Sequence, residues 1–151
     1  MLLDDWLGNK YDPFVILKSG VSRLEHVQQK NDSVRHGFGV RIWKEIYGLQ
    51  TLHGCRIYGS PTASWNSNIS VAFLKDHFGI RDNLAEKILL MWDDLSGHWT
   101  DEGKDYASSI NLFVVKVPPR YTYVCQPAIR DGSSETCRHH IVDLRKWEKS
   151  I

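Results

Sequence analysis

The stretch TLHGCRIYGSPTASWNSNISVAFLKDHFG, residues 51–79, decides how the middle of the chain folds. Its first part mixes β-branched and aromatic residues between glycines, a composition typical of a strand. Turn-forming residues follow, and Ser67 or Asn68 is placed to cap a helix over 69–77. Gly79 is suited to end that helix. The stretch therefore predicts a strand, a hydroxyl-rich turn and a helix in succession.

The residues before this stretch predict helices. Asp12 and Pro13 form a helix-start signal, and apolar residues recur after them at helical spacing. Gly20 interrupts the pattern, so a short strand or turn stays open for the first half of this segment. A second helix, expected to end near Gly48, is predicted by the apolar pattern of Val40, Trp43, Ile46 and Tyr47.

The rest of the chain predicts one more helix and then strands. Residues 81–95, RDNLAEKILLMWDDL, are the strongest helix prediction, with an apolar face formed by Leu84, Ile88, Met91 and Trp92. A loop is expected over 96–109. The periodicity then changes, and strands are predicted within 110–119, 121–129 and 139–147. Because the helices come first and the strands last, the sequence indicates a single α+β domain. Its carboxyl-terminal sheet is expected to be mainly antiparallel, and the alternative that this sheet is split stays open.

Size and charge limit the classes of protein to which the chain can belong. The 151 residues are 42% hydrophobic and 25% charged, which suits one globular domain spanning 1–151. The net charge of +1 gives no signal for nucleic acid or a membrane surface as partner. No apolar run approaches the ~20 residues of a membrane span, and acidic residues near the amino terminus do not suit a signal peptide. We therefore expect a cytoplasmic protein, with delivery into another cell left open.

The cysteines and histidines are the residues to consider for a disulfide scaffold, a metal site or a hydrolase. Cys55, Cys125 and Cys137 are an odd number with no paired spacing, which disfavours a disulfide scaffold and a zinc site built from cysteine pairs. A hydrolase with one of these cysteines as nucleophile is one alternative, and its candidate histidine bases are His53, His98, His139 and His140. Cys55 and Cys125 fall in predicted strands, however, and not at the helix amino terminus that activates a thiol. The ligand-capable residues match no metal-site spacing, so we expect no metal.

Two His-Gly steps are suited to hold a dinucleotide in a sheet cleft that has no glycine-rich loop. Such a step at a strand end lets backbone groups reach the nicotinamide amide while the imidazole bonds the ribose. The candidates are His53–Gly54 in LHGCR and His36–Gly37 in RHGFG, and the sequence leaves the choice between them open. Downstream, YGSPTASWNSNISVAFLKDHF supplies a strand, a hydroxyl-rich turn and a helix, and INLFVVKVPPRYTYV with DGSSETCRHHIVDL supplies closing strands.

These segments together resemble the ADP-ribosyltransferases, the family of bacterial toxins, phage enzymes and poly-ADP-ribose polymerases. The resemblance covers residues 35–144 and implies an NAD-consuming enzyme that transfers ADP-ribose to a macromolecular target, expected to be a protein. It implies a cofactor-binding set of His53, Gly54, Tyr58, Ser60 and Thr62. In that set the His53 imidazole orients the ribose, and Tyr58 stacks on the nicotinamide or packs beside it. Glu135 would be catalytic and stabilise the oxocarbenium-like transition state as the glycosidic bond breaks.

Two further alternatives remain open. The arginine-type subgroup of the family would pair an arginine, Arg41 or Arg56, with a hydroxyl motif made of Ser60, Thr62 and Ser64. The alternative from another class is a non-catalytic binding protein, such as an inhibitor, an immunity partner or an effector. Exposed tryptophans would supply its hot-spot contacts, with candidates at Trp6, Trp43, Trp65 and Trp147.

Overall fold

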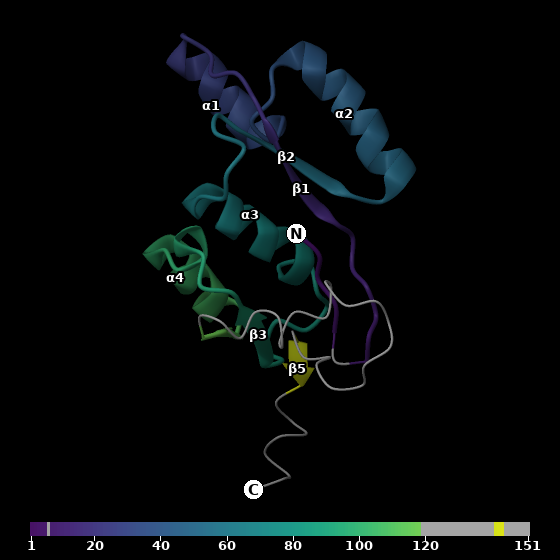
Figure 1. Ribbon diagram of the computed structural model, residues 1–151, viewed down its shortest axis with the longest axis vertical. Helices are drawn as coiled ribbons and strands as arrows, with labels where there is room; N and C mark the ends of the chain where they lie inside the picture. The colour runs from purple at the N-terminus through teal and green to yellow at the C-terminus, as the bar shows by residue number, and fades with distance from the viewer. Residues whose placement is uncertain (6, 119–140, 144–151) are drawn as a thin grey trace, which may run out of the picture. The chain divides into compact units, whose positions relative to one another are not determined.

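The computed structural model describes residues 1–5, 7–118 and 141–143 (Figure 1). The chain divides into two compact units. Unit 1 consists of Met1 and Asp12–Trp65, and unit 2 consists of Leu2–Tyr11 and Asn66–Ile151. Each unit contains two parallel strands joined through helices. The single domain expected over 1–151 stays a prediction, since compact units of this size also occur as parts of one domain.

Unit 1 is a two-stranded parallel sheet with two helices in the connection. Its elements in chain order are β1 (Phe14–Lys18), α1 (Glu25–Val34), α2 (Val40–His53) and β2 (Arg56–Ser60). Phe14 lies opposite Arg56, and Lys18 lies opposite Ser60. Parallel strands require such a crossover connection, because a tight hairpin reverses the chain direction. The buried core of this unit is formed by Phe38, Ile46 and Ile57, with Val15, Trp43 and Cys55 packed against it.

Helix α2 runs further than the sequence predicts. It passes through the exposed Gly48 and ends at Gly54, whose left-handed conformation (φ 55°) is the usual helix terminator. The last turns are held by the buried Gln50, whose side-chain oxygen accepts a hydrogen bond from the Ile57 backbone N–H at 2.7 Å. The predicted strand is therefore shortened to β2, and His53 lies in a helix.

Unit 2 contains a helix followed by a second pair of parallel strands, which are joined by a crossover connection. Its elements are α3 (Ser67–Phe78), β3 (Ile88–Trp92), the 3₁₀ turn η1 (Ser96–His98), α4 (Asp101–Ser109), β4 (Leu112–Lys116) and β5 (Ile141–Asp143). β3 lies in the middle of the strand order β4-β3-β5, parallel to β4 and antiparallel to the three-residue β5. Fully or almost fully buried apolar side chains fill this unit, including Phe73, Leu74, Leu90, Trp92, Ala107 and Leu112.

The predicted helix over 69–77 is confirmed with a small shift. α3 begins at Ser67, and its cap is Asn66, whose side chain accepts a hydrogen bond from the Ile69 N–H at 3.0 Å. Gly79 ends the helix as expected. The predicted strand within 110–119 is also confirmed as β4.

The prediction of a mainly antiparallel sheet is wrong. Both five-residue strand pairs in the described residues are parallel, and the antiparallel pairing there is limited to three residues with β5 and a single bridge between Asp4 and Lys10. Residues 81–95 are not a helix, because ILLMW forms the strand β3. Five consecutive apolar residues are typical of a parallel strand that is covered on both faces.

The loop predicted over 96–109 instead contains α4. Thr100 caps this helix by accepting a hydrogen bond from the Gly103 N–H, and acidic residues occupy its first turn. These are sequence signals for a helix start. Reading β3 as a helix and α4 as a loop concealed a complete strand-helix-strand unit, and this is why the sheet was expected to be antiparallel.

Candidate functional site

A His-Gly step is fixed against the outer edge of β2 in unit 1. The Gly59 N–H donates to the His36 carbonyl at 2.7 Å, and His36 Nδ1 lies 3.1 Å from the Ile57 carbonyl oxygen. Gly37 has a φ of +86°, and a Cβ at this position would lie 2.5 Å from the Gly59 oxygen. Only glycine fits so close to β2 in this conformation. The backbone and the ring of His36 are thereby held at one place beside the strand.

The His36 ring belongs to a stack of aromatic rings. It lies parallel to the Tyr58 ring, with centroids 4.1 Å apart and planes 3° apart. Phe14 stacks on Tyr58 as well, at 4.8 Å and 13°. Two rings this close and this parallel to Tyr58 must lie on its opposite faces, since on one face they would collide. Tyr58 therefore packs beside the His36–Gly37 step, and a nicotinamide can stack on Tyr58 only if one of these neighbours moves.

Hydroxyl groups gather where β2 ends. Ser60 is buried, and its Oγ lies 3.4 Å from Thr62 Oγ1, which in turn hydrogen-bonds to Ser64 Oγ. Ser19 follows β1 and donates its N–H to the Ser60 carbonyl at 3.0 Å. Because β1 and β2 are parallel, their carboxyl ends lie at one edge of the sheet, which is where parallel sheets bind ligands. The last residue of β1, Lys18, adds an exposed cation there.

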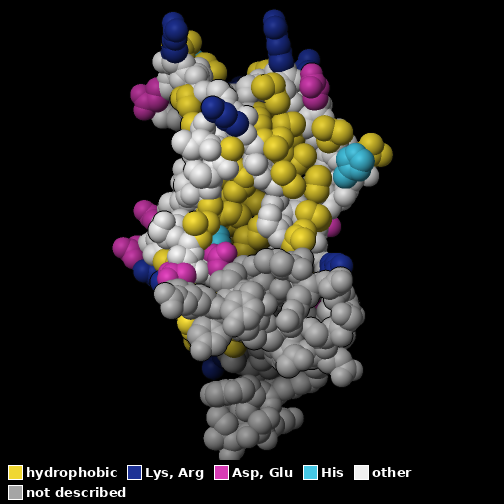
Figure 2. Space-filling model, in the orientation of Figure 1, with side chains coloured by type: hydrophobic (Ala, Val, Ile, Leu, Met, Phe, Trp, Pro, Cys, Tyr) yellow, Lys and Arg dark blue, Asp and Glu magenta, His cyan; other side chains and the backbone are white. Residues whose placement is uncertain are grey.

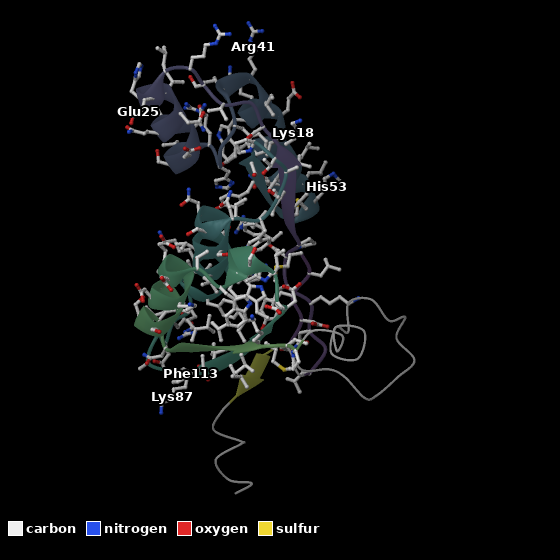
Figure 3. All side chains as sticks on the ribbon, turned by 60° about the vertical axis from the view of Figure 1, so that its left-hand side comes forward. Lys18, Glu25, Arg41, His53, Lys87 and Phe113 are labelled. Carbon is white, nitrogen blue, oxygen red and sulfur yellow. The ribbon has the colours of Figure 1, made fainter. Side chains whose placement is uncertain are left out.

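The other His-Gly step has a different position. His53 is exposed in the last turn of α2, and Gly54 ends that helix (Figure 3). The nearest side chain to a Cβ built on Gly54 would be that of Asp12, at 3.8 Å. The structure thus brings Tyr58, Ser60 and Thr62 together on β2 and its following turn, and places His53–Gly54 at the start of the connection that precedes them.

Several predicted groups lie outside the described residues. These are the proposed catalytic residue Glu135, and Cys125, Cys137, His139 and His140 of the hydrolase alternative. Cys55 is described: it is a free, half-buried cysteine packed against the core of unit 1. In the described part of the chain, no group of three or more His, Cys, Asp or Glu side chains lies close enough to hold a metal ion.

Unit 2 contains a histidine-carboxylate pair that the sequence analysis did not single out. His98 is 3% exposed, its Nδ1 lies 2.7 Å from Asp93 Oδ1, and its ring stacks on Trp92 at 4.3 Å. Burial lowers the pKa of His98, and the neighbouring Asp93 opposes this shift. Asp93 directly follows β3, in the segment predicted as helix, and His98 lies in the segment predicted as a loop, so the sequence analysis did not bring the two together.

The surroundings of this pair are also occupied by paired charges. Lys116, at the end of β4, forms an ion pair with Asp94 and lies 5.3 Å from the centre of the Trp99 ring. The hydroxyl of the buried Ser70 donates to the Gly97 carbonyl. This arrangement stabilises the loop between β3 and α4. Because the His98–Asp93 pair serves to hold this loop, we take the His36–Tyr58–Ser60 region of unit 1, and not this pair, as the candidate site.

In the described residues, no helix has both the length and the apolar character needed to cross a membrane. Comparisons of the chain with protein-family models, with curated protein sequences and with solved structures found no match.

Proposed function

We propose that the protein is an NAD-consuming, ADP-ribosyltransferase-like enzyme in which His36–Gly37, and not His53–Gly54, is the cofactor-binding step. The observation that supports this choice is the contact between His36–Gly37 and β2, made by the Gly59–His36 hydrogen bond and the close approach of Gly37. It joins a His-Gly step to the strand that carries the hydroxyl-rich turn. The sequence resemblance requires these two features side by side.

The hydrogen bond of His36 decides what its ring can offer a ligand. The Ile57 carbonyl only accepts hydrogen bonds, so in the neutral imidazole the proton sits on Nδ1. Nε2 is then an acceptor, which suits a ribose hydroxyl as donor. In this proposal His36 orients the cofactor ribose and Tyr58 fixes the ring of His36 by stacking.

The hydroxyl groups of Ser60, Thr62 and Ser64 have the chemistry to donate hydrogen bonds to phosphate oxygens, and the Lys18 ammonium has the matching charge. Glu135 keeps its proposed catalytic role on the strength of the resemblance alone. The acceptor of ADP-ribose is proposed to be a protein, and the site of action the cytoplasm.

The test is release of nicotinamide from NAD by the purified full chain. We expect release by the wild type and a loss of about 10²-fold or more in Glu135→Gln, because a carboxylate that stabilises the transition state supplies several kcal/mol. Equal rates in the two proteins would remove Glu135 from the mechanism. If the wild type releases no nicotinamide from NAD with any of the protein acceptors supplied, the proposal as a whole is contradicted.

A non-catalytic protein-binding role is the second candidate. It is favoured by large apolar side chains that stand exposed on α2, among them Ile42, Leu49 and Leu52. Exposed apolar surface of this kind is common where partner proteins bind. Lack of NAD binding together with capture of a specific protein would favour this role.

A further inference from the structure

Among the described residues, the outer edge of β1 in unit 1 carries backbone groups that pair with no strand. The Arg56 N–H donates to the Pro13 carbonyl and the Ser19 N–H donates to the Ser60 carbonyl, so the odd-numbered residues of this strand direct their backbone groups toward β2. Phe14, Ile16 and Lys18 consequently direct theirs to the other side.

The described residues occupy the beginning of this outer edge. The Phe14 N–H donates to the Met1 carbonyl at 2.9 Å, and the Met1 amino group donates to the Phe14 carbonyl. The outward N–H and C=O of Ile16 and Lys18 have no hydrogen-bond partner among the described residues. An open strand edge of this kind is a template for pairing with another extended chain.

An apolar surface lies beside this edge. Leu17 is 42% exposed and lies on the same face of the sheet as Val15, which packs against the core of unit 1. On α2, the Trp43 side contacts His36 near β2, so the side that carries Ile42 and Leu49 lies toward β1. We call the exposed set the α2–β1 face, and it consists of Leu17, Ile42, Leu49 and Leu52, exposed by 42%, 49%, 45% and 75%.

Basic side chains lie beside the α2–β1 face and the edge of β1. Figure 2 shows hydrophobic side chains concentrated over α2 and the neighbouring strand, with backbone and other side chains between them. Arg41 lies in the first turn of α2, at the end opposite His53 (Figure 3). Lys18 is the last residue of β1, and its side chain lies on the face of the sheet opposite to Leu17. Residues 12–65 contain seven Lys and Arg against four Asp and Glu, a net charge of +3. The surface therefore combines a strand edge that is open among the described residues, an apolar face and basic side chains beside them.

We propose that β1 and the α2–β1 face bind an extended segment of a partner protein by strand addition. The backbone of the segment pairs with the outward groups of Ile16 and Lys18. Its alternate apolar side chains pack on Leu17, Ile42 and Leu49, and carboxylates at one end of it meet Lys18 and Arg41. This proposal does not depend on the proposed NAD chemistry.

The charges disfavour a second copy of the chain as the occupant. Antiparallel self-pairing centred on Leu17 puts Lys18 of each copy opposite Ile16 of the other, with both lysines on one face of the joined sheet. It also brings together two units of net charge +3. Like charges on neighbouring strands are destabilising, whereas an acidic segment is attracted to the same surface.

The experiment uses the full chain and two fluorescein-labelled synthetic peptides that alternate valine and threonine, with Asp-Glu at the amino end in one and at the carboxyl end in the other. We expect one of them to raise the fluorescence anisotropy on binding. A peptide of the same length with Lys-Arg in place of Asp-Glu should bind about tenfold more weakly, and added salt should reduce this difference.

Two variants on opposite sides of α2 form the matched pair. Leu49→Ser, on the α2–β1 face, is expected to weaken binding about tenfold, and Tyr47→Ser, 62% exposed on the other side, by less than about twofold. Circular dichroism checks that both fold. Equal affinity of the two variants, or no binding of either acidic peptide at millimolar concentration, overturns the proposal. A concentration-dependent dimer that Leu49→Ser abolishes also overturns it, because the occupant is then a second copy.

Discussion

The two units share a strand-helix-strand arrangement but differ in how far their strands are paired and their side chains buried. In unit 2, β3 is paired on both sides, by β4 and β5, and its side chains Leu90 and Trp92 are almost fully buried. In unit 1, β2 is the one strand that pairs along the length of β1 among the described residues, and Leu17 is exposed. The described part of unit 2 thus pairs and buries its central strand, whereas β1 of unit 1 leaves backbone and apolar groups at the surface among the described residues.

This difference indicates where function is to be sought. The histidine of unit 2, His98, is buried and held by Asp93 and Trp92. The histidine of unit 1, His36, is only half-buried and lies beside a strand that ends in a row of hydroxyl groups. A half-exposed histidine with one fixed nitrogen can serve a ligand, while a buried one contributes mainly to packing.

The largest expected effect concerns the core of unit 2. Trp92→Ala should lower the free energy of unfolding by about 3–5 kcal/mol, because it leaves a cavity among Phe73, Leu90 and His98. The matched change in unit 1, Trp43→Ala, removes a half-buried ring and should cost about half as much. Urea unfolding followed by circular dichroism measures both. Equal losses would show that the two units are packed equally well.

A smaller effect is expected at the His-Gly step of unit 1. Gly37→Ala should cost about 2 kcal/mol, because alanine is strained at a φ of +86° and its Cβ would meet the Gly59 carbonyl oxygen. Gly48→Ala is the control, since this helical glycine has no atom within 4 Å of its Cβ position, and it should stabilise by up to about 1 kcal/mol. Thermal unfolding of the two variants in parallel tests this. A stable Gly37→Ala protein would mean that the step is not fixed against β2.

The smallest effect is a dependence of stability on pH that arises in unit 2. Burial places the pKa of His98 in the folded protein below its ordinary value of 6.5. The unfolded chain therefore binds a proton at His98 before the folded chain does. Stability should be unaffected by this group above about pH 6.5, fall as the pH drops below that value, and level off once the pH passes the folded pKa.

Comparison with His98→Gln isolates this contribution from all other groups. The wild type should lose stability relative to the variant as the pH falls from 7 to 5, measured by urea unfolding at each pH. Parallel curves for the two proteins would contradict the sign of the pKa shift. A gain of the wild type at acid pH would mean that Asp93 outweighs burial.

Local sequence signals predicted α3 and β4 because cap, periodicity and terminator agree there. They failed at β3, since the five apolar residues of ILLMW fit one face of a helix as well as a buried strand. They also failed at the end of α2, where Gln50 fixes the helix through a hydrogen bond to Ile57 seven residues later. Contacts of this kind depend on tertiary packing and not on local composition.

Prediction of the candidate site from the sequence is limited in the same way. The residue types were recognised from the sequence, and Tyr58, Ser60 and Thr62 do lie together on β2 and its turn. The choice between His36 and His53 rests on the approach of Gly37 to Gly59, across more than twenty residues of chain. No sequence pattern within either His-Gly segment predicts that contact.

The most direct test of the central proposal is calorimetric titration of NAD into the wild type, His36→Ala and His53→Ala. The account predicts that the wild type and His53→Ala bind NAD with the same Kd. His36→Ala should bind about tenfold or more weakly, the effect of one lost hydrogen bond at a fixed imidazole. Unchanged binding in His36→Ala, or no binding of NAD to the wild type at millimolar concentration, would contradict it.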